Sequence, residues 1–89
     1  MGKTARERPN RLAEKLKQIR EGLELSQNEM LVRLGLEGKL SRTAISGYEL
    51  GTSEPTLPTL LKYSRLAGVH MEVLVDDDMD LPERLARRK

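Results

Sequence analysis

The stretch "SRTAISGYELG", residues Ser41 to Gly51, predicts a short helix with two different faces. Serine is a good residue to cap the start of a helix, and glycine is a common stop at its end. On a helix, Ala44, Ile45 and Tyr48 share one apolar face, because residues four positions apart are neighbours. The other face carries Arg42, Thr43, Ser46 and Gly47. The stretch therefore predicts a helix that packs through one side and keeps the other free of bulky apolar groups.

The composition limits the class of protein. The chain has 89 residues, enough for one domain with a modest core. Its aromatic residues are Tyr48 and Tyr63 alone, so the core must consist of aliphatic side chains, which favours packed helices. There is no cysteine for a disulfide or a thiolate metal site, no long apolar run and no signal-peptide pattern at residues 1–10. We therefore expect a soluble, cytoplasmic, all-α protein.

The charge is distributed unevenly. Residues 1–11 contain four basic residues and one acid, whereas residues 12–75 contain eight of each sign. Five acids follow in residues 76–83, and four bases in residues 84–89. Affinity for a polyanion depends on where the cations lie, so the net charge of +2 is weak evidence for it. We expect residues 1–9 to form a basic arm, disordered or in contact with the phosphates or minor groove of DNA.

Local signals predict two helices before the opening stretch. Apolar residues at i, i+4, i+7 and i+11 indicate a helix from about residue 10 to 22. Ser26 and Glu29 form a capping box that begins a second helix, and Gly35 ends it. The segment 36–39 has no sustained period and contains another glycine, so we expect a loop there.

Two further helices are expected after Gly51. Thr56 is the expected cap of a helix that ends near Gly68, and Pro58 is tolerated in its first turn. Residues 69–75 fit either a short helix or a strand, because their valines also alternate; four helical neighbours favour the helix. Residues 76–89 form a charged tail, either with a short helix or mobile.

The strings "LSQNEMLVRLG" and "LSRTAISGYELGTSEPTLPTLLKYSRLAGV" resemble the Cro and phage-repressor type of helix-turn-helix protein. The similarity covers about residues 12 to 75. It implies a five-helix bundle that regulates transcription, with a helix-turn-helix DNA-binding domain over residues 10–75. In such a protein one helix crosses the DNA backbone so that the next, here residues 41–50, can enter the major groove.

The resemblance assigns roles to individual residues. It implies that Arg42 and Thr43 contact base edges at the start of the recognition helix, with Ser46 and Gly47 one turn further along. Arginine suits guanine and the threonine methyl suits thymine. The residues implied to contact phosphate are Gln27, Asn28, Lys39, Ser41, Thr52 and Ser53. Arg20 and Glu49 match a pair that joins two helices in this family.

The sequence departs from the family in three places. The turn at residues 36–39 is about four residues longer than usual and lies beside the expected DNA surface. Gly47 removes a side chain that often contacts a base, at a cost to the helix of about 1 kcal/mol. It marks either a close approach of the backbone to DNA or a concentration of base contacts in the first turn. Glu54 places an acid near the expected DNA backbone.

The remaining polar residues suggest no catalytic centre. His70 is the only histidine and fits a loop or cap position. The run "DDDMD" of residues 76–80 is interpreted as a solvated charge run, not a metal site. No nucleophile and base pair, phosphate loop or metal spacing is present, so we expect no enzyme activity, no cofactor and no metal.

The sequence thus predicts a repressor-like regulator that binds a two-fold duplex DNA site as a homodimer. The alternative is a protein-interaction module, such as an antitoxin or partner-docking protein, in which DNA binding is secondary or lost. The neutral middle of the chain, Gly47 and Glu54 favour that alternative. The expected dimer surface is the fifth helix with the tail, through Met71, Val73, Val75, Met79 and Leu81.

Overall fold

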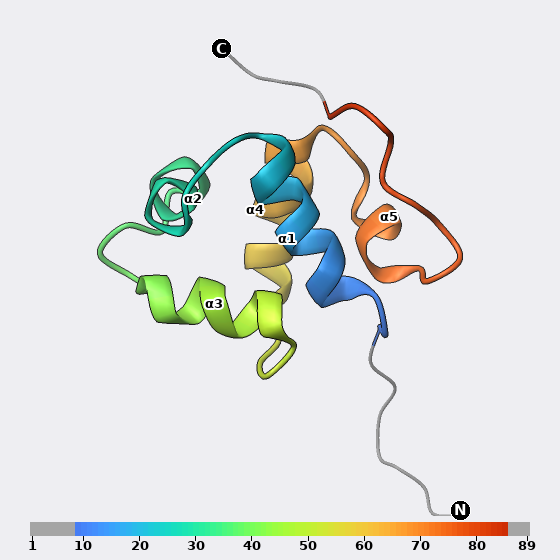
Figure 1. Cartoon of the computed structure of the whole chain (residues 1–89). Helices are drawn as coiled ribbons and strands as arrows, with labels where there is room; N and C mark the ends of the chain where they lie inside the picture. The colour runs from blue at the N-terminus through green and yellow to red at the C-terminus, as the bar shows by residue number, and fades with distance from the viewer. Residues whose placement is uncertain (1–8, 86–89) are drawn as a thin grey trace, which may run out of the picture.

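The computed structural model describes residues 9–85, which form five helices and no strand (Figure 1). The helices are α1 Leu12–Gly22, α2 Gln27–Leu34, α3 Arg42–Leu50, α4 Leu57–Ala67 and α5 Met71–Val75. The expected all-α, five-helix fold is confirmed, and residues 69–75 contain a helix as we preferred. Within residues 9–85, no helix is long and apolar enough to cross a membrane. The basic arm, apart from Pro9, lies outside the described residues.

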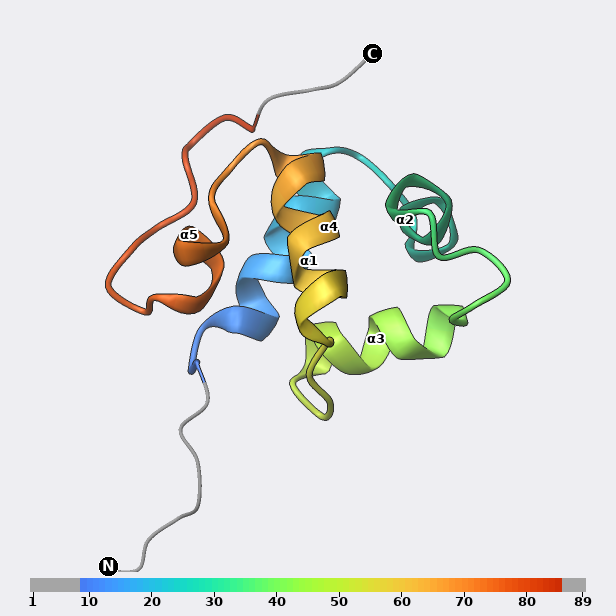
Figure 2. The same cartoon turned by 180° about the vertical axis from the view of Figure 1, so that it is seen from behind.

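Helices α1 and α4 pack together at the centre of the molecule, with α2 and α3 on one side and α5 on the other (Figures 1 and 2). Their shared core is aliphatic, apart from the two tyrosines. The fully buried apolar side chains are Leu16, Ile19, Met30, Ile45, Tyr63 and Leu74. Among the described residues the Tyr63 hydroxyl has no hydrogen-bond partner, and burial raises the pKa of this group well above its usual range.

The extended turn between α2 and α3 is anchored to the core. Leu36 is buried, and Gly38 adopts a left-handed conformation with φ of 85° that a residue with a side chain rarely takes. Glu37 and Leu40 form an isolated backbone bridge across the turn. The four extra residues are therefore held in a fixed loop, and Lys39 is exposed on it.

The acidic segment after α5 is engaged with α1 through Asp77 and Asp80, so its interpretation as a solvated charge run was wrong for these two residues, whereas Asp78 is exposed. The Asp77 carboxylate accepts hydrogen bonds from the backbone N–H groups of Asn10 and Arg11, at 2.9 and 3.0 Å. The Arg11 guanidinium pairs with Asp80 at 2.7 Å. Asp77 thus caps the start of α1, and the bonds from Asn10 and Arg11 hold the pKa of its carboxyl below its usual value. Local sequence could not reveal this contact, because its partners are 66 and 67 residues apart.

A buried lysine completes the junction between α1 and α5. The side chain of Lys15 has no exposed area, and its Nζ donates to the carbonyl oxygens of Val73 and Asp76, both at 2.8 Å. These carbonyls lie at the end of α5, where the last carbonyl groups of a helix have no N–H partner within the helix itself. We call Arg11, Lys15, Asp77 and Asp80 the α1–α5 clamp.

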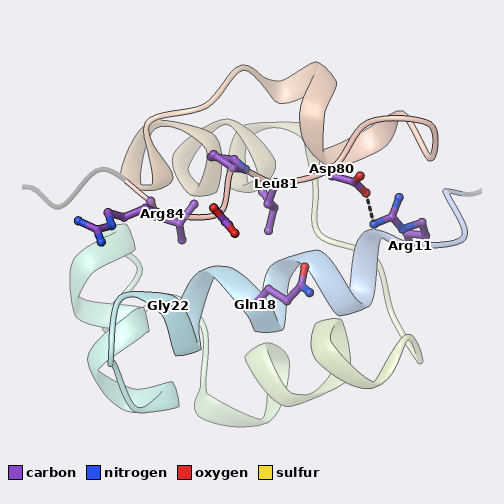
Figure 3. A pocket seen from close by; sticks show the side chains of 9 residues that line it. Arg11, Gln18, Gly22, Asp80, Leu81 and Arg84 are labelled. Atoms are coloured by element: carbon purple, nitrogen blue, oxygen red, sulfur yellow. Dashed lines mark ion pairs between the residues drawn. The ribbon is translucent and has the colours of Figure 1, made fainter.

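The tail continues from the clamp along α1. Residues 76–85 contain no helix, and Leu81 and Leu85 pack against the core. A hollow of about 430 Å³ remains between this segment and α1, where Gln18 and Gly22 face Leu81 and Arg84 (Figure 3). The described part of the tail therefore covers the outer side of α1.

Candidate nucleic-acid interface

Helix α3 separates its inner and outer faces as the sequence predicted. Ile45 is fully buried and Tyr48 nearly so, whereas Arg42 and Thr43 are exposed and Ser46 is half-buried. Within residues 9–85, the side chains of Arg42, Thr43 and Ser46 form no hydrogen bond or ion pair. The outer face of α3 therefore presents a cation and two hydroxyl groups that are available to a partner.

The start of α3 has no side-chain cap. Ser41 occupies the N-cap position with an extended backbone, but its hydroxyl accepts no bond from the helix. The first N–H groups of a helix lack intrahelical partners, and the helix dipole makes this end favourable for an anion. Ser41 and the preceding Lys39 are both exposed. This end of α3 can thus accept a phosphate beside Lys39.

The start of α2, unlike the start of α3, has a side-chain cap. Its capping box is complete, since the Ser26 hydroxyl accepts from Glu29 N–H at 3.0 Å and the Glu29 carboxylate accepts from Ser26 N–H at 2.7 Å. The Glu29 charge therefore already occupies this end of the helix. Gln27 is half-buried and its Nε2 donates to Glu49 at 3.2 Å, while Asn28 is exposed. The resemblance implies a phosphate contact at Gln27, but the capping box and the hydrogen bond to Glu49 leave fewer groups at this end of α2 for such a contact.

Arg20 and Glu49 form a bidentate ion pair that joins α1 to α3. Arg20 Nε and Nη2 donate to the two carboxylate oxygens of Glu49 at 2.7 and 3.0 Å. Arg20 Nη1 also donates to the Leu25 carbonyl at 2.9 Å, and the pair is largely buried. The hydrogen bond that Arg20 donates to Glu49 raises the pKa of the Arg20 guanidinium. With Gln27 as a third donor, the pair holds α1, α2 and α3 in one fixed arrangement.

Gly47 has a structural role that neither sequence-based interpretation considered. A Cβ atom on Gly47 would lie only 2.7 Å from Ser53 Oγ and 3.4 Å from Thr52 Oγ1. The loop after α3 folds back here, because the Gly47 carbonyl accepts from the N–H groups of Thr52 and Ser53 at 3.0 and 3.3 Å. The absent side chain makes room for this loop. Gly47 therefore faces the loop more than the open side of α3, and only its backbone could approach a base.

Sequence reasoning missed one prominent residue of this surface. Leu50 is 73% exposed, and its position one helical turn beyond Ser46 puts it on the outer face of α3. A shallow hollow beside it is also lined by Lys17 and Gln27. The spacing of Arg42, Ser46 and Leu50 at i, i+4 and i+8 was the signal that could have located Leu50. Lys17 could not be located in this way, because it belongs to α1 and lies far from Leu50 in the sequence.

The other predicted residues lie in the segments that flank α3. Lys39 and Ser41 precede α3, and Thr52 and Ser53 follow it, although the Thr52 hydroxyl also donates to the Gly47 carbonyl at 3.3 Å. Among residues 9–85 no group of histidine, aspartate or glutamate is placed to hold a metal ion. The arrangement offers hydrogen-bond donors, the exposed cations Lys39 and Arg42, and the exposed apolar side chain of Leu50 on and beside α3.

Two packed helices joined by a turn, with the second exposing a polar face, define a helix-turn-helix protein. Comparison with known proteins agrees with this class. Residues 16–74 match the family model described as "Helix-turn-helix", and the chain belongs to this family. The resemblance found in the sequence is thereby confirmed.

A curated relative extends the comparison. The chain is 35% identical over 63 residues to the "Uncharacterized HTH-type transcriptional regulator YqaE" of Bacillus subtilis (strain 168). The match includes 71% of this chain and 51% of that protein, so the chain spans about half the length of the relative. No solved structure matches the chain.

Proposed function

We propose that this protein is a sequence-specific, double-stranded DNA-binding regulator of transcription that places α3 in the major groove. The observation that carries the proposal is the outer face of α3, whose polar side chains have no hydrogen-bond partner within residues 9–85 while its inner face is buried. Arg42 can form two hydrogen bonds to guanine, the Thr43 methyl can contact a thymine methyl, and Ser46 can bond to several bases. The family and the described relative support the same function.

Phosphate contacts would position the helix from both ends. The uncapped start of α3 is the strongest candidate, because its first N–H groups have no side-chain cap and the exposed Lys39 lies two residues before Ser41. Thr52 and Ser53 flank the other end, and Gln27 with Asn28 would contact the backbone from α2. Lys17 of α1 is an additional exposed cation near α3.

We further propose repressor-like action by a homodimer on a two-fold site, in the cytoplasm, without a catalytic role. Half-sites one helical turn apart, about 34 Å, would match a dimer with two α3 helices. The second candidate is a protein-docking or antitoxin-like module. The exposed Leu50 favours it, because an apolar side chain at the edge of a polar face also suits a protein partner.

Selection of duplexes from a random pool tests the proposal. We expect a palindromic consensus with native protein, and binding that weakens steeply with salt. Arg42→Ala is expected to lose about 1–3 kcal/mol of discrimination at one position in each half-site. Arg65→Ala is the matched control, because Arg65 is an exposed arginine in the last turn of α4, outside this surface. Enrichment of no sequence would refute DNA recognition and favour the docking module.

A further inference from the structure

Most of the apolar side chains that the sequence assigned to a dimer surface are engaged within their own chain. Met71, Val73, Met79 and Leu81 are half-buried, and Leu81 packs against the core. A different residue is the most exposed of the large apolar side chains in the described part of the chain. Leu50, the last residue of α3, has 73% of its surface open to solvent.

Leu50 points in nearly the same direction as Thr43. The two residues are seven positions apart, which is about two turns of a helix with 3.6 residues per turn. Ser46 lies one turn before Leu50, and the buried Ile45 and Tyr48 hold the opposite side of α3 against the core. Figure 1 shows α3 at the edge of the molecule, with its last turn beside the loop that leads to α4. Leu50 therefore belongs to the face that the proposed function, on which this inference rests, places in the major groove.

The surroundings of Leu50 are polar. A hollow of about 180 Å³ beside this leucine is otherwise lined by polar and charged residues of three helices, namely Lys17, Arg20, Gln27, Ser46 and Glu49. Within α3, Leu50 is the only large apolar side chain that is exposed. The core of a protein–protein interface is usually apolar and depleted of charge. A single leucine among polar groups therefore suits one small apolar group better than the apolar surface of a protein.

We propose that Leu50 selects thymine by contact with the C5-methyl group of this base in the major groove. The other groups that base pairs present in this groove are hydrogen-bond donors and acceptors, whereas the thymine methyl is apolar. Leucine placed against a donor or acceptor would remove water from that group and return no hydrogen bond, which is unfavourable. Leu50 is thus a specificity-determining residue in addition to Arg42 and Thr43, and it acts through the apolar part of a base.

The spacing along α3 predicts where this thymine lies. Arg42 and Leu50 are eight residues apart, about 12 Å along the helix axis at a rise of 1.5 Å per residue. Successive bases on one strand are about 3.4 Å apart. With α3 along the groove, the thymine is expected about three or four base pairs from the guanine that Arg42 contacts, in the same half-site.

Selection of duplexes from a random pool, with the whole native chain and with Leu50→Ala, tests the assignment. The native consensus should contain thymine at this position. Leu50→Ala should lose the preference there and keep the preference for guanine opposite Arg42. The substitution preserves the fold, because Leu50 is exposed and alanine favours a helix. Val32→Ala is the matched control, since it truncates another exposed apolar residue, on α2, and should keep the full consensus.

Replacing the selected thymine by deoxyuridine removes the methyl group and leaves the hydrogen-bonding groups of the base in place. Native protein and Val32→Ala are each expected to bind the deoxyuridine duplex about four-fold more weakly, the effect of exposing one buried methyl group. Leu50→Ala should bind the two duplexes equally. The titrations measure the coupling between one side chain and one methyl group.

The outcomes separate this inference from the proposed function. A methyl effect in native protein that Leu50→Ala abolishes supports the inference. A consensus that Leu50→Ala leaves intact, or an equal methyl effect in native protein and Leu50→Ala, overturns the inference, although the enriched consensus still supports DNA recognition by α3. In that case the exposed leucine favours contact with a protein partner. Enrichment of no duplex would overturn the proposed function together with this inference.

Discussion

Two groups of polar side chains on this small molecule have opposite surroundings. Around α1, Arg20, Lys15 and Asp77 direct their hydrogen-bonding groups to partners inside the fold. On the outer face of α3, Arg42 and Thr43 have no such partners in the described residues. Residue type does not separate the groups, since both contain an arginine. The two groups differ in burial and in whether their hydrogen bonds are satisfied within the fold. Substitutions around α1 should therefore change stability, and substitutions on the outer face of α3 should change binding.

Breaking the Arg20–Glu49 pair is expected to have the largest effect on stability. Arg20→Met leaves the Glu49 carboxylate, only 4% exposed, without its ionic partner. Removal of one member of a buried ion pair costs about 3–5 kcal/mol. Urea unfolding followed by circular dichroism would measure the change. Arg42→Met is the matched control on the outer face and should alter stability by no more than about 0.5 kcal/mol. Equal losses in the two variants would show that the two regions do not differ as described.

Removing the charge of Asp77 is expected to have a smaller, pH-dependent effect. Asp77→Asn should lower the unfolding midpoint at neutral pH, because the carboxylate accepts two N–H bonds at the start of α1. The folded pKa of Asp77 is below its unfolded value, so its stabilising contribution is complete above pH about 4 and declines as pH falls through the folded value. Thermal unfolding from pH 7 to pH 2 would test this. The native protein should approach Asp77→Asn at the acidic end, and a constant difference across this range would contradict the capping role.

Asp78→Asn is the control for this pH series. Asp78 is its exposed neighbour, and its backbone N–H donates to the Asp76 carboxylate at 2.9 Å. The carboxylate of Asp78 caps no helix in the described residues, so its replacement should leave the acid dependence of unfolding close to that of the native protein.

The sequence could predict the helices because their signals are local. The capping box at Ser26 and the glycines after α2, α3 and α4 mark the observed ends within one residue. The outer face of α3 was also predictable, since the buried positions Ile45 and Tyr48 determine which residues remain outside. The clamp was not predictable, because Lys15 and Asp77 meet partners that are 58 to 67 residues away. A lysine side chain in a helix is normally exposed to solvent. Lys15 is buried because its ammonium group donates to carbonyl groups at the end of α5.

Gly47 lies between the outer face of α3 and the loop that follows this helix, and its replacement tests which of the two explains the glycine. Gly47→Ala gains about 1 kcal/mol of helix propensity, but the new Cβ would lie 2.7 Å from Ser53 Oγ. Ser53 is exposed, so its hydroxyl can turn away at a modest cost, and the net change should be within about 1 kcal/mol of zero.

Combining Gly47→Ala with Ser53→Ala isolates the contact. The Ser53 Cβ lies 3.8 Å from the added atom, an ordinary distance, so removing the hydroxyl should release the full propensity gain. We expect a coupling of at least about 0.5 kcal/mol between the two changes, measured by urea unfolding of the native protein and all three variants. Additive effects would show that loop packing does not require the glycine. If Gly47→Ala also weakened binding to a selected duplex in both backgrounds, the close approach of α3 to DNA would be the better reason for a glycine at this position.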